Sequence, residues 1–326
     1  MMKLLLTHAP LARTTYYGAT ALERLRTLVD VVLHQGDAPL DPKGVIAAAK
    51  DADYIIADRA TAVPAEVFAA LPKLRVVMRS AIDIRNIDVA AASKAGVLVT
   101  HAEAGFVPSV VELTVGFLVE LSRGMSRAIT AYHEGQRPEI RVGRQLAGST
   151  VGIVGYGRIS RALAPVLAAL GMKVTVSDPY AQVDDRRFVK LPLDELMAGA
   201  DYVICLAIAN AETENLLDDA AFARMKPDAF FINMSRGNLV DEAALAKALT
   251  EGRIAGAAMD VGRAPDQMPS PELARLPNVI ATPHIGGLTP PASESQAMDT
   301  VRQVEALVKG EMPPGAANPQ DWTRRA

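Results

Sequence analysis

The chain has 326 residues, of which 50% are hydrophobic and 22% are charged, and its formal net charge is -3. This length predicts two domains, and the absence of a Lys and Arg excess argues against nucleic acid as a partner. No apolar run approaches the roughly 18 residues of a membrane span, so no membrane partner is expected. The single cysteine, Cys205, lies in an apolar run, which favours a buried thiol and a reducing compartment, the cytoplasm.

Short apolar segments alternate with helical patterns up to about residue 99. Met1–Thr7 could pass for a weak signal peptide, but its apolar run is too short, so we expect a first strand there. The alternation predicts a mostly parallel sheet with helices on both faces. Further strands are expected at 31–33, 54–57, 75–78 and 97–99, and helices at 21–28, 45–49, 65–71 and 87–95.

A long helical pattern follows from Ser109 to Tyr132, with Ser109 as the expected N-cap and Glu112 completing a capping box. The alternation of strands and helices then resumes, and a last helix ends at Gly310. Strands are expected at 150–154, 173–177, 202–206, 229–233, 254–259 and 279–281, and helices at 160–170, 242–250 and 292–309.

A glycine-rich turn joins the strand at 150–154 to the next helix. It reads Gly155-Tyr156-Gly157-Arg158-Ile159-Ser160, which is typical of a dinucleotide-binding turn. Gly155 would make the tight turn, and Gly157 would let the backbone approach a pyrophosphate at the helix N-terminus. Ser160 replaces the third glycine of this pattern, so the match is imperfect.

An acidic residue ends the next strand at about the 20-residue spacing that this pattern expects. Asp178 would accept hydrogen bonds from the ribose hydroxyls and repel a 2′-phosphate, which favours NAD over NADP. Arg186 and Arg187 follow closely and could hold a 2′-phosphate, so NADP stays an alternative. The alternative is that Asp178 only forms a turn before Pro179.

Three polar residues come just after predicted strands of the second half, namely Arg236, Asp260 and His284. Ligands of open parallel sheets lie beyond the carboxyl ends of the strands, so these side chains should share one crevice with the nucleotide. A histidine titrates near neutral pH and can protonate a nascent alkoxide. An arginine fork suits a substrate carboxylate and carbonyl. The alternatives are a capping histidine and a surface ion pair.

With these motifs in order, the sequence resembles the D-isomer specific 2-hydroxyacid dehydrogenase family. The resemblance covers nearly the whole chain and implies a Rossmann NAD-binding domain, 102–290, inserted into a flavodoxin-like substrate domain, 1–101 with 291–326. It also implies a homodimer with the active site in the interdomain cleft. No metal site is expected. The matching segments are Asn86–Ala92, Ser109–Glu112, Val151–Ile159, Asp178, Asn233–Gly237, Asp260–Val261 and Thr282–Gly287.

The resemblance also assigns roles to individual residues. Arg236 binds the substrate, His284 is the general acid and base, and Asp260 holds the nicotinamide amide. The cofactor residues are Gly155, Tyr156, Gly157, Arg158, Ile159, Asp178, Ser235, Asp260 and Gly287. The substrate residues are Ser80, Ala81, Ile82, Asp83 and Arg236.

Two departures from the family pattern concern the chemistry. Pro265 stands where the family has a glutamate that bonds the catalytic histidine, and the adjacent Asp266 is our candidate replacement. The alternative is an exposed aspartate in a turn. In the substrate loop, Asp83 replaces a glycine, and its charge would repel a substrate carboxylate unless it points away.

Three functions fit these residues. The first is an enzyme that interconverts a 2-keto acid and a D-2-hydroxy acid with NAD, and intact Arg236 and His284 favour it. The second is an NAD-binding regulatory or weakly active protein, which the missing glutamate and Asp83 keep open. The third is a related NAD enzyme whose substrate is not a simple keto acid.

Overall fold

The computed structural model describes residues 1–325, apart from the side chain of Asp266. The chain forms two compact units. Unit 1 comprises Met1–Phe106 and Leu288–Ala326, and unit 2 comprises Val107–Gly287. Unit 1 is therefore built from both ends of the chain.

Unit 1 contains a five-stranded parallel sheet in the order β2-β1-β3-β4-β5. This is the flavodoxin-like order, in which ligands bind beyond the carboxyl ends of β1 and β3. The strands are β1 (Lys3–Leu6), β2 (Asp30–Leu33), β3 (Tyr54–Ala57), β4 (Val76–Arg79) and β5 (Leu98–His101).

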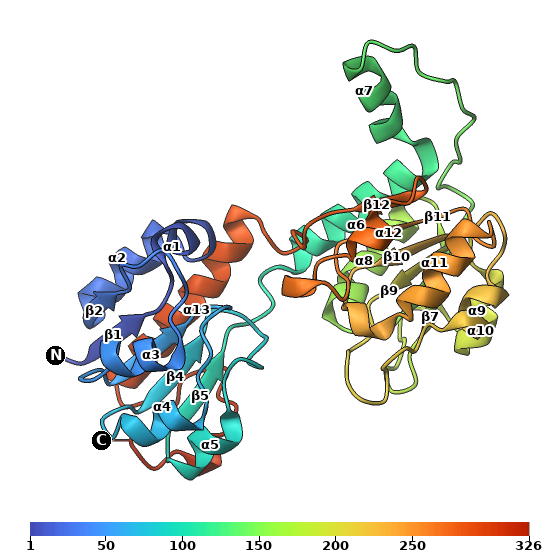
Figure 1. Cartoon of the computed structure of the whole chain (residues 1–326). Helices are drawn as coiled ribbons and strands as arrows, with labels where there is room; N and C mark the ends of the chain where they lie inside the picture. Colours follow the sequence, from blue (N-terminus) through green and yellow to red (C-terminus); the bar gives the residue numbers. More distant parts are fainter. Residues whose placement is uncertain (326) are drawn as a thin grey trace. The chain divides into compact units, whose positions relative to one another are not determined.

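Helices cover both faces of this sheet because alternate strand residues point to opposite sides. Leu4 and Leu6 pack into one core with residues of α2 and α13, whereas Leu5 packs into the other with residues of α3 and α4. α13, from the end of the chain, lies beside α2 (Figure 1). The helices are α1 (Pro10–Tyr16), α2 (Ala19–Leu28), α3 (Pro42–Ala48), α4 (Ala65–Ala70), α5 (Val89–Lys94) and α13 (Pro290–Val308).

Unit 2 contains a seven-stranded parallel sheet in the order β12-β11-β10-β9-β6-β7-β8. The order reverses between β6 and β9, as in a dinucleotide-binding Rossmann fold. The predicted fold class is therefore confirmed. The strands are β6 (Thr150–Val154), β7 (Lys173–Ser177), β8 (Val189–Lys190), β9 (Tyr202–Cys205), β10 (Phe230–Asn233), β11 (Gly256–Met259) and β12 (Val279–Ala281).

Helices also flank the sheet of unit 2. One core joins the sheet to the helices α9, α10 and α11, and α6 packs against α8 and contacts β10 and β11. The helices are α6 (Val107–Arg123), α7 (Met125–His133), α8 (Arg158–Ala169), α9 (Leu193–Gly199), α10 (Asp219–Arg224), α11 (Glu242–Thr250) and α12 (Pro271–Ala274), with short turns η1 (Gly237–Leu239), η2 (Pro265–Gln267) and, in unit 1, η3 (Pro319–Asp321).

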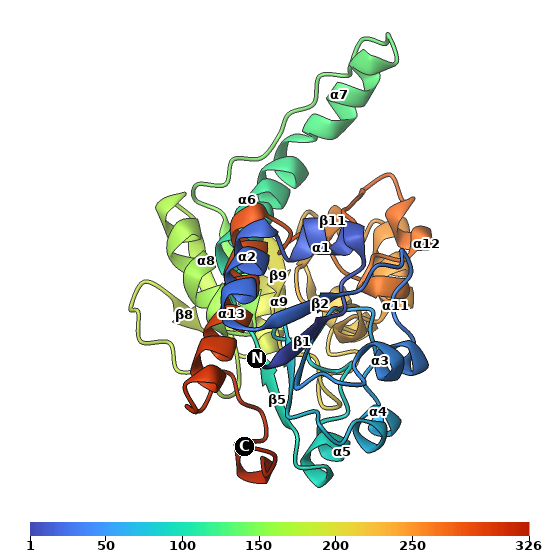
Figure 2. The ribbon, with the colours of Figure 1, turned by 90° about the vertical axis from the view of Figure 1, so that its left-hand side faces the viewer.

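The prediction of one helix from Ser109 to Tyr132 is wrong in two respects. The helix begins at Val107, so Ser109 is an internal, buried residue and not the N-cap. It is interrupted at Gly124, whose left-handed backbone (φ 62°) starts α7 in a new direction. α7 extends away from the remainder of unit 2 and buries none of its residues (Figure 2). Among the described residues, no helix is both long and apolar enough to cross a bilayer.

Candidate active site

Five loops at the carboxyl ends of the unit 2 strands carry the candidate residues. β6 leads into the glycine turn, β7 into Asp178, β10 into Arg236, β11 into Asp260 and β12 into His284. Since all these strands are parallel and β10, β11 and β12 are neighbours, the last three residues follow adjacent strand ends. The geometry therefore gathers them at the edge where a Rossmann sheet binds its dinucleotide.

The glycine turn has the backbone that the motif predicts. Gly155 has a φ of 91°, and a Cβ placed on it would lie 2.5 Å from the Cα of Ala207, so only glycine fits. A Cβ on Gly157 would meet open space at the start of α8, where a phosphate could approach. The Ser160 hydroxyl donates to the Gly155 carbonyl at 2.7 Å. Serine at the third glycine position is thus used to brace the turn.

Asp178 links the end of β7 to the glycine turn. Its carboxylate accepts backbone N–H bonds from Tyr156 at 2.7 Å, Tyr180 at 2.9 Å and Ala181 at 2.8 Å. Although partial burial opposes ionisation, these bonds hold the pKa of Asp178 below its usual range. An ionised carboxylate offers about four acceptor positions, so about one remains for a ribose hydroxyl.

Arg236 lies in the loop after β10 and is half-buried. Its Nη1 donates to the Ser235 carbonyl at 2.7 Å, and its own carbonyl accepts a bond from Asn233 Nδ2 at 3.1 Å. The next residue must be glycine, because a Cβ on Gly237 would clash with the backbone of Gly262 in the loop after β11. The loop is therefore anchored on both sides of the arginine. Ser235, a predicted cofactor residue, donates its hydroxyl to the Ala207 carbonyl at 2.6 Å.

Asp260 holds the loop that carries His284. It is 2% exposed, and its carboxylate accepts bonds from the Thr282 hydroxyl at 2.6 Å, Ile285 N at 2.8 Å and Gly286 N at 2.7 Å. His284 has a left-handed backbone with a φ of 55°, which is uncommon for a non-glycine residue and typical of functional sites. The sequence placed Asp260 near the nicotinamide and did not predict this clamp.

We expect Asp260→Ala to lower the free energy of unfolding by about 3 kcal/mol, because it leaves buried donors without an acceptor. That loss corresponds to a fall in Tm of about 8 °C, measurable by thermal denaturation. Asp218→Ala, which removes only the cap of α10, should cost about 1 kcal/mol. An Asp260→Ala protein that melts like the wild type would show that the clamp is dispensable.

The loop after β11 contains Asp266, which lies in η2, but its side chain is outside the described part of the structure. The surrounding loop is well anchored. Gly262 N donates to the Gln267 carbonyl at 2.9 Å, and Glu242 accepts bonds from Arg263 N and the Ser270 hydroxyl. The proposed contact between Asp266 and His284 therefore stays a proposal.

The predicted substrate loop belongs to unit 1 and follows β4. Ser80 is buried, and its hydroxyl lies 3.4 Å from both His8 Nε2 and Arg79 Nη1. Burial lowers the pKa of His8 to about 4 and the pKa of Arg79 to about 10, so at neutral pH the first is uncharged and the second is a cation. Ile82 is partly exposed. The start of the loop is thus fixed by polar side chains from β4 and the residues after β1.

Asp83, which the sequence identifies as an obstacle to a carboxylate, is held by Arg85. The Arg85 guanidinium donates to both carboxylate oxygens, with Nε to Oδ1 at 2.9 Å and Nη2 to Oδ2 at 2.6 Å. These hydrogen bonds raise the pKa of Arg85 above its usual value. The sequence contained both residues, but their pairing was not predicted.

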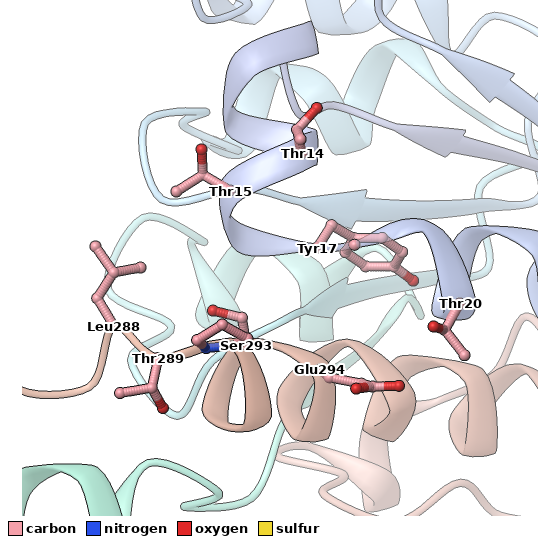
Figure 3. A pocket seen from close by; sticks show the side chains of 10 residues that line it. Thr14, Thr15, Tyr17, Thr20, Leu288, Thr289, Ser293 and Glu294 are labelled. Carbon is pink, nitrogen blue, oxygen red and sulfur yellow. The ribbon is translucent and has the colours of Figure 1, made fainter.

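A cavity of about 390 Å³ lies elsewhere in unit 1, between α1 and the beginning of α13 (Figure 3). Its lining includes the threonines of residues 14–20, Ser293 and Glu294 together with apolar surface, and the Tyr17 hydroxyl is bonded to Thr300 at 2.6 Å. None of the predicted substrate or cofactor residues lines this cavity. It therefore gives no support to the candidate active site.

Two further groups bear on the chemistry. Cys205 is fully buried in β9, and burial raises the pKa of its thiol to about 12. A thiol in that state is not a nucleophile at neutral pH. Among the side chains that the structure describes, which exclude that of Asp266, no group of three His, Cys, Asp or Glu is arranged to hold a metal ion.

Comparison with known proteins agrees with this geometry. The family model described as "D-isomer specific 2-hydroxyacid dehydrogenase, NAD binding domain" matches residues 115–286. A D-3-phosphoglycerate dehydrogenase of Mycobacterium bovis is 37% identical over 86% of this chain and 54% of its own. A glyoxylate reductase of Thermofilum pendens is 33% identical over 91% of both chains. The crystal structure of a Thermus thermophilus protein, 30% identical, covers 97% of this chain and 100% of its own with a TM-score of 0.87.

The chain belongs to the D-isomer specific 2-hydroxyacid dehydrogenase family, and its unit 2 contains the NAD-binding domain of that family. The predicted cofactor, NAD, is thereby confirmed. The chain spans about half the length of the phosphoglycerate dehydrogenases that it matches.

Proposed function

We propose that the protein is an NAD-dependent dehydrogenase that interconverts a 2-keto acid and a D-2-hydroxy acid. The observation that carries the proposal is the arrangement of Arg236 and His284. Arg236 follows β10 and His284 follows β12, and only β11 lies between these two strands in the sheet of unit 2. Asp260, which follows β11, fixes the loop that carries His284 through three hydrogen bonds. In this assignment, unit 2 binds NAD and unit 1 binds the substrate. The corresponding domain boundaries expected from the sequence are 102–290 for the NAD-binding domain and 1–101 with 291–326 for the substrate domain.

Each residue has a defined task in the reduction. Bound NADH supplies a hydride to the carbonyl carbon of the substrate. Arg236 holds the substrate carboxylate and stabilises the charge that develops on the carbonyl oxygen. His284 donates its proton to that oxygen and becomes neutral, and the reverse reaction uses it as the base. The backbone N–H groups of loop 80–83 in unit 1 are assigned to the same carboxylate.

The remaining cofactor residues complete the proposed site. Gly155, Tyr156, Gly157, Arg158 and Ile159 hold the pyrophosphate, and Asp178 holds the ribose. Asp260 already accepts three bonds, which leaves about one acceptor position for the nicotinamide amide. Ser235, in the loop after β10, and Gly287, in the loop after β12, are the last two residues assigned to the cofactor.

The proposal is tested by following NADH absorbance with purified protein and a panel that includes glyoxylate, pyruvate, hydroxypyruvate and its 3-phosphate. The relatives named glyoxylate reductase and D-3-phosphoglycerate dehydrogenase motivate this choice. We expect at least one of these acids to be reduced. Tight NADH binding without reduction of any of them would support the regulatory alternative, which the replacement of the family glutamate by Pro265 keeps open.

We propose that Asp266 substitutes for the family glutamate and raises the pKa of His284. Reduction needs protonated His284, so activity falls as pH rises through that pKa. Asp266→Asn should therefore lower turnover about tenfold and move this fall to lower pH. The pH profile of kcat is the measurement, and an unchanged profile would exclude Asp266 from the site.

We further propose that the protein acts as a homodimer in the cytoplasm. The family resemblance supports the dimer, and so does an exposed apolar arm formed by α7 and the segment after it. Its exposed side chains are Met125, Ile129, Tyr132, Ile140 and Val142. Isolated apolar side chains are common on surfaces, but a concentrated set marks an interface. Light scattering should give the mass of two chains, and a single-chain mass would reject the dimer.

A further inference from the structure

The substrate loop after β4 carries a negative charge at the place where the proposed function needs to bind one. Asp83 lies among the backbone N–H groups of residues 80–83 that are assigned to the substrate carboxylate. An uncompensated Asp83 carboxylate would repel that anion, because both groups are negatively charged. The loop therefore needs a feature that offsets Asp83 if it accepts a 2-keto acid.

The backbone itself poses no obstacle. Among the described residues, the only non-glycine positions with positive φ are Asn215, Gln267 and His284. Asp83 is not one of them, so this loop does not require a glycine at that position for its conformation. The replacement of glycine by aspartate therefore changes the charge of the loop without straining its backbone.

Arg85 supplies the opposite charge two residues later. Its guanidinium bonds both oxygens of Asp83, and its backbone N–H donates to Oδ1 at 3.1 Å. Arginine is permanently charged, so it offsets the negative charge of Asp83. Because its guanidinium bonds both oxygens, it also fixes the orientation of the carboxylate. The Asp83 side chain is 32% exposed and that of Arg85 is 66% exposed. Such exposed pairs contribute little to stability, so the loss of Arg85 should leave the fold intact.

We propose that Arg85 determines whether loop 80–83 accepts an anionic substrate, by neutralising Asp83 and holding its carboxylate. This inference rests on the proposed function, because it takes the loop as the site of the substrate carboxylate. Arg85 is a specificity-determining residue that acts through Asp83, and it need not touch the substrate. Its effect should therefore disappear when Asp83 loses its charge.

A double-mutant cycle tests this dependence. Arg85→Gln, Asp83→Asn, the double variant and the wild type are compared for KM and kcat with each accepted keto acid at saturating NADH. Lys73→Gln is the matched control, because it removes a cation from an exposed ion pair with Asp51 in the same unit. That pair lies in the loops before β3 and β4, at the amino-terminal ends of the strands, whereas loop 80–83 follows the carboxyl end of β4.

We expect Arg85→Gln to raise KM about tenfold while kcat stays within about twofold. The double variant should return to within about threefold of the wild-type KM, and Lys73→Gln should not change it. An unchanged KM in Arg85→Gln would overturn the proposal. A rise in KM that persists in the double variant would also overturn it, since Arg85 would then act independently of Asp83.

Binding of oxamate, an unreactive keto-acid analogue, separates this inference from the proposed function. Its Kd for the NADH-loaded protein should follow the same pattern across the four variants. If the pattern appears in Kd although no keto acid is reduced, the proposed function fails and the role of Arg85 stands. If the wild type reduces keto acids but its variants bind oxamate equally, the role of Arg85 fails alone. If the wild type binds no oxamate and reduces nothing, both fail.

Discussion

Replacing His284 with alanine is expected to lower kcat for keto-acid reduction by about 10³-fold, because the nascent alkoxide loses its proton donor. NADH affinity should stay within about twofold, since the proposed function assigns the dinucleotide mainly to the glycine turn and Asp178. Steady-state rates and NADH fluorescence titration measure the two quantities. The combination distinguishes a catalytic histidine from one that only supports the fold.

A second variant controls for the unusual backbone of this position. His284 has a φ of 55°, and alanine tolerates that conformation less well than asparagine does. His284→Asn should therefore fold like the wild type and still be inactive. If His284→Asn retained a kcat within tenfold of the wild type, the histidine would not be the acid.

Replacing Arg236 with glutamine is expected to lower kcat/KM by about 10³-fold or more, through both a higher KM and a lower kcat. The first effect follows from losing the fork that binds the substrate carboxylate. The second follows from losing charge stabilisation at the carbonyl oxygen, which is worth more in the transition state than in the ground state. Arg236→Lys should recover only part of the loss, because an ammonium restores the charge but not the planar geometry.

Arg253→Gln provides the control for this prediction. Arg253 forms ion pairs with Asp219 and Glu251 before β11, at the amino-terminal edge of the same sheet. Its loss should leave kcat/KM unchanged. Wild-type kinetics in Arg236→Gln would remove the residue from the substrate site.

Much of the fold was predictable because its strands are short apolar segments between clear helical patterns. Every strand of both sheets was predicted, with two-residue β8 as the exception, and the NAD-binding turn was found because its glycines are close in sequence. The interruption of the long helix was not predicted, since Gly124 fits a helical pattern and reveals its left-handed backbone only in three dimensions. The helix α1 was missed because it is short and buries none of its residues.

The candidate site was predictable residue by residue, but its internal contacts were not. Spacing along the chain places Asp260 and His284 after neighbouring strands, yet it does not show that one carboxylate binds three groups of the histidine loop. The same holds for Asp83, whose pairing with Arg85 depends on the direction of two side chains. Motif patterns identify residue types, whereas these contacts depend on loop geometry.

Direct transfer of deuterium tests the central claim, which is hydride delivery to the carbonyl carbon of a bound keto acid. The measurement uses NADH with both C4 hydrogens of the nicotinamide replaced by deuterium, in ordinary water. It determines the isotope content and configuration of the product. The account predicts a 2-hydroxy acid of D configuration with the deuterium on its second carbon. A product of L configuration, or one whose new C–H hydrogen comes from water, would contradict it.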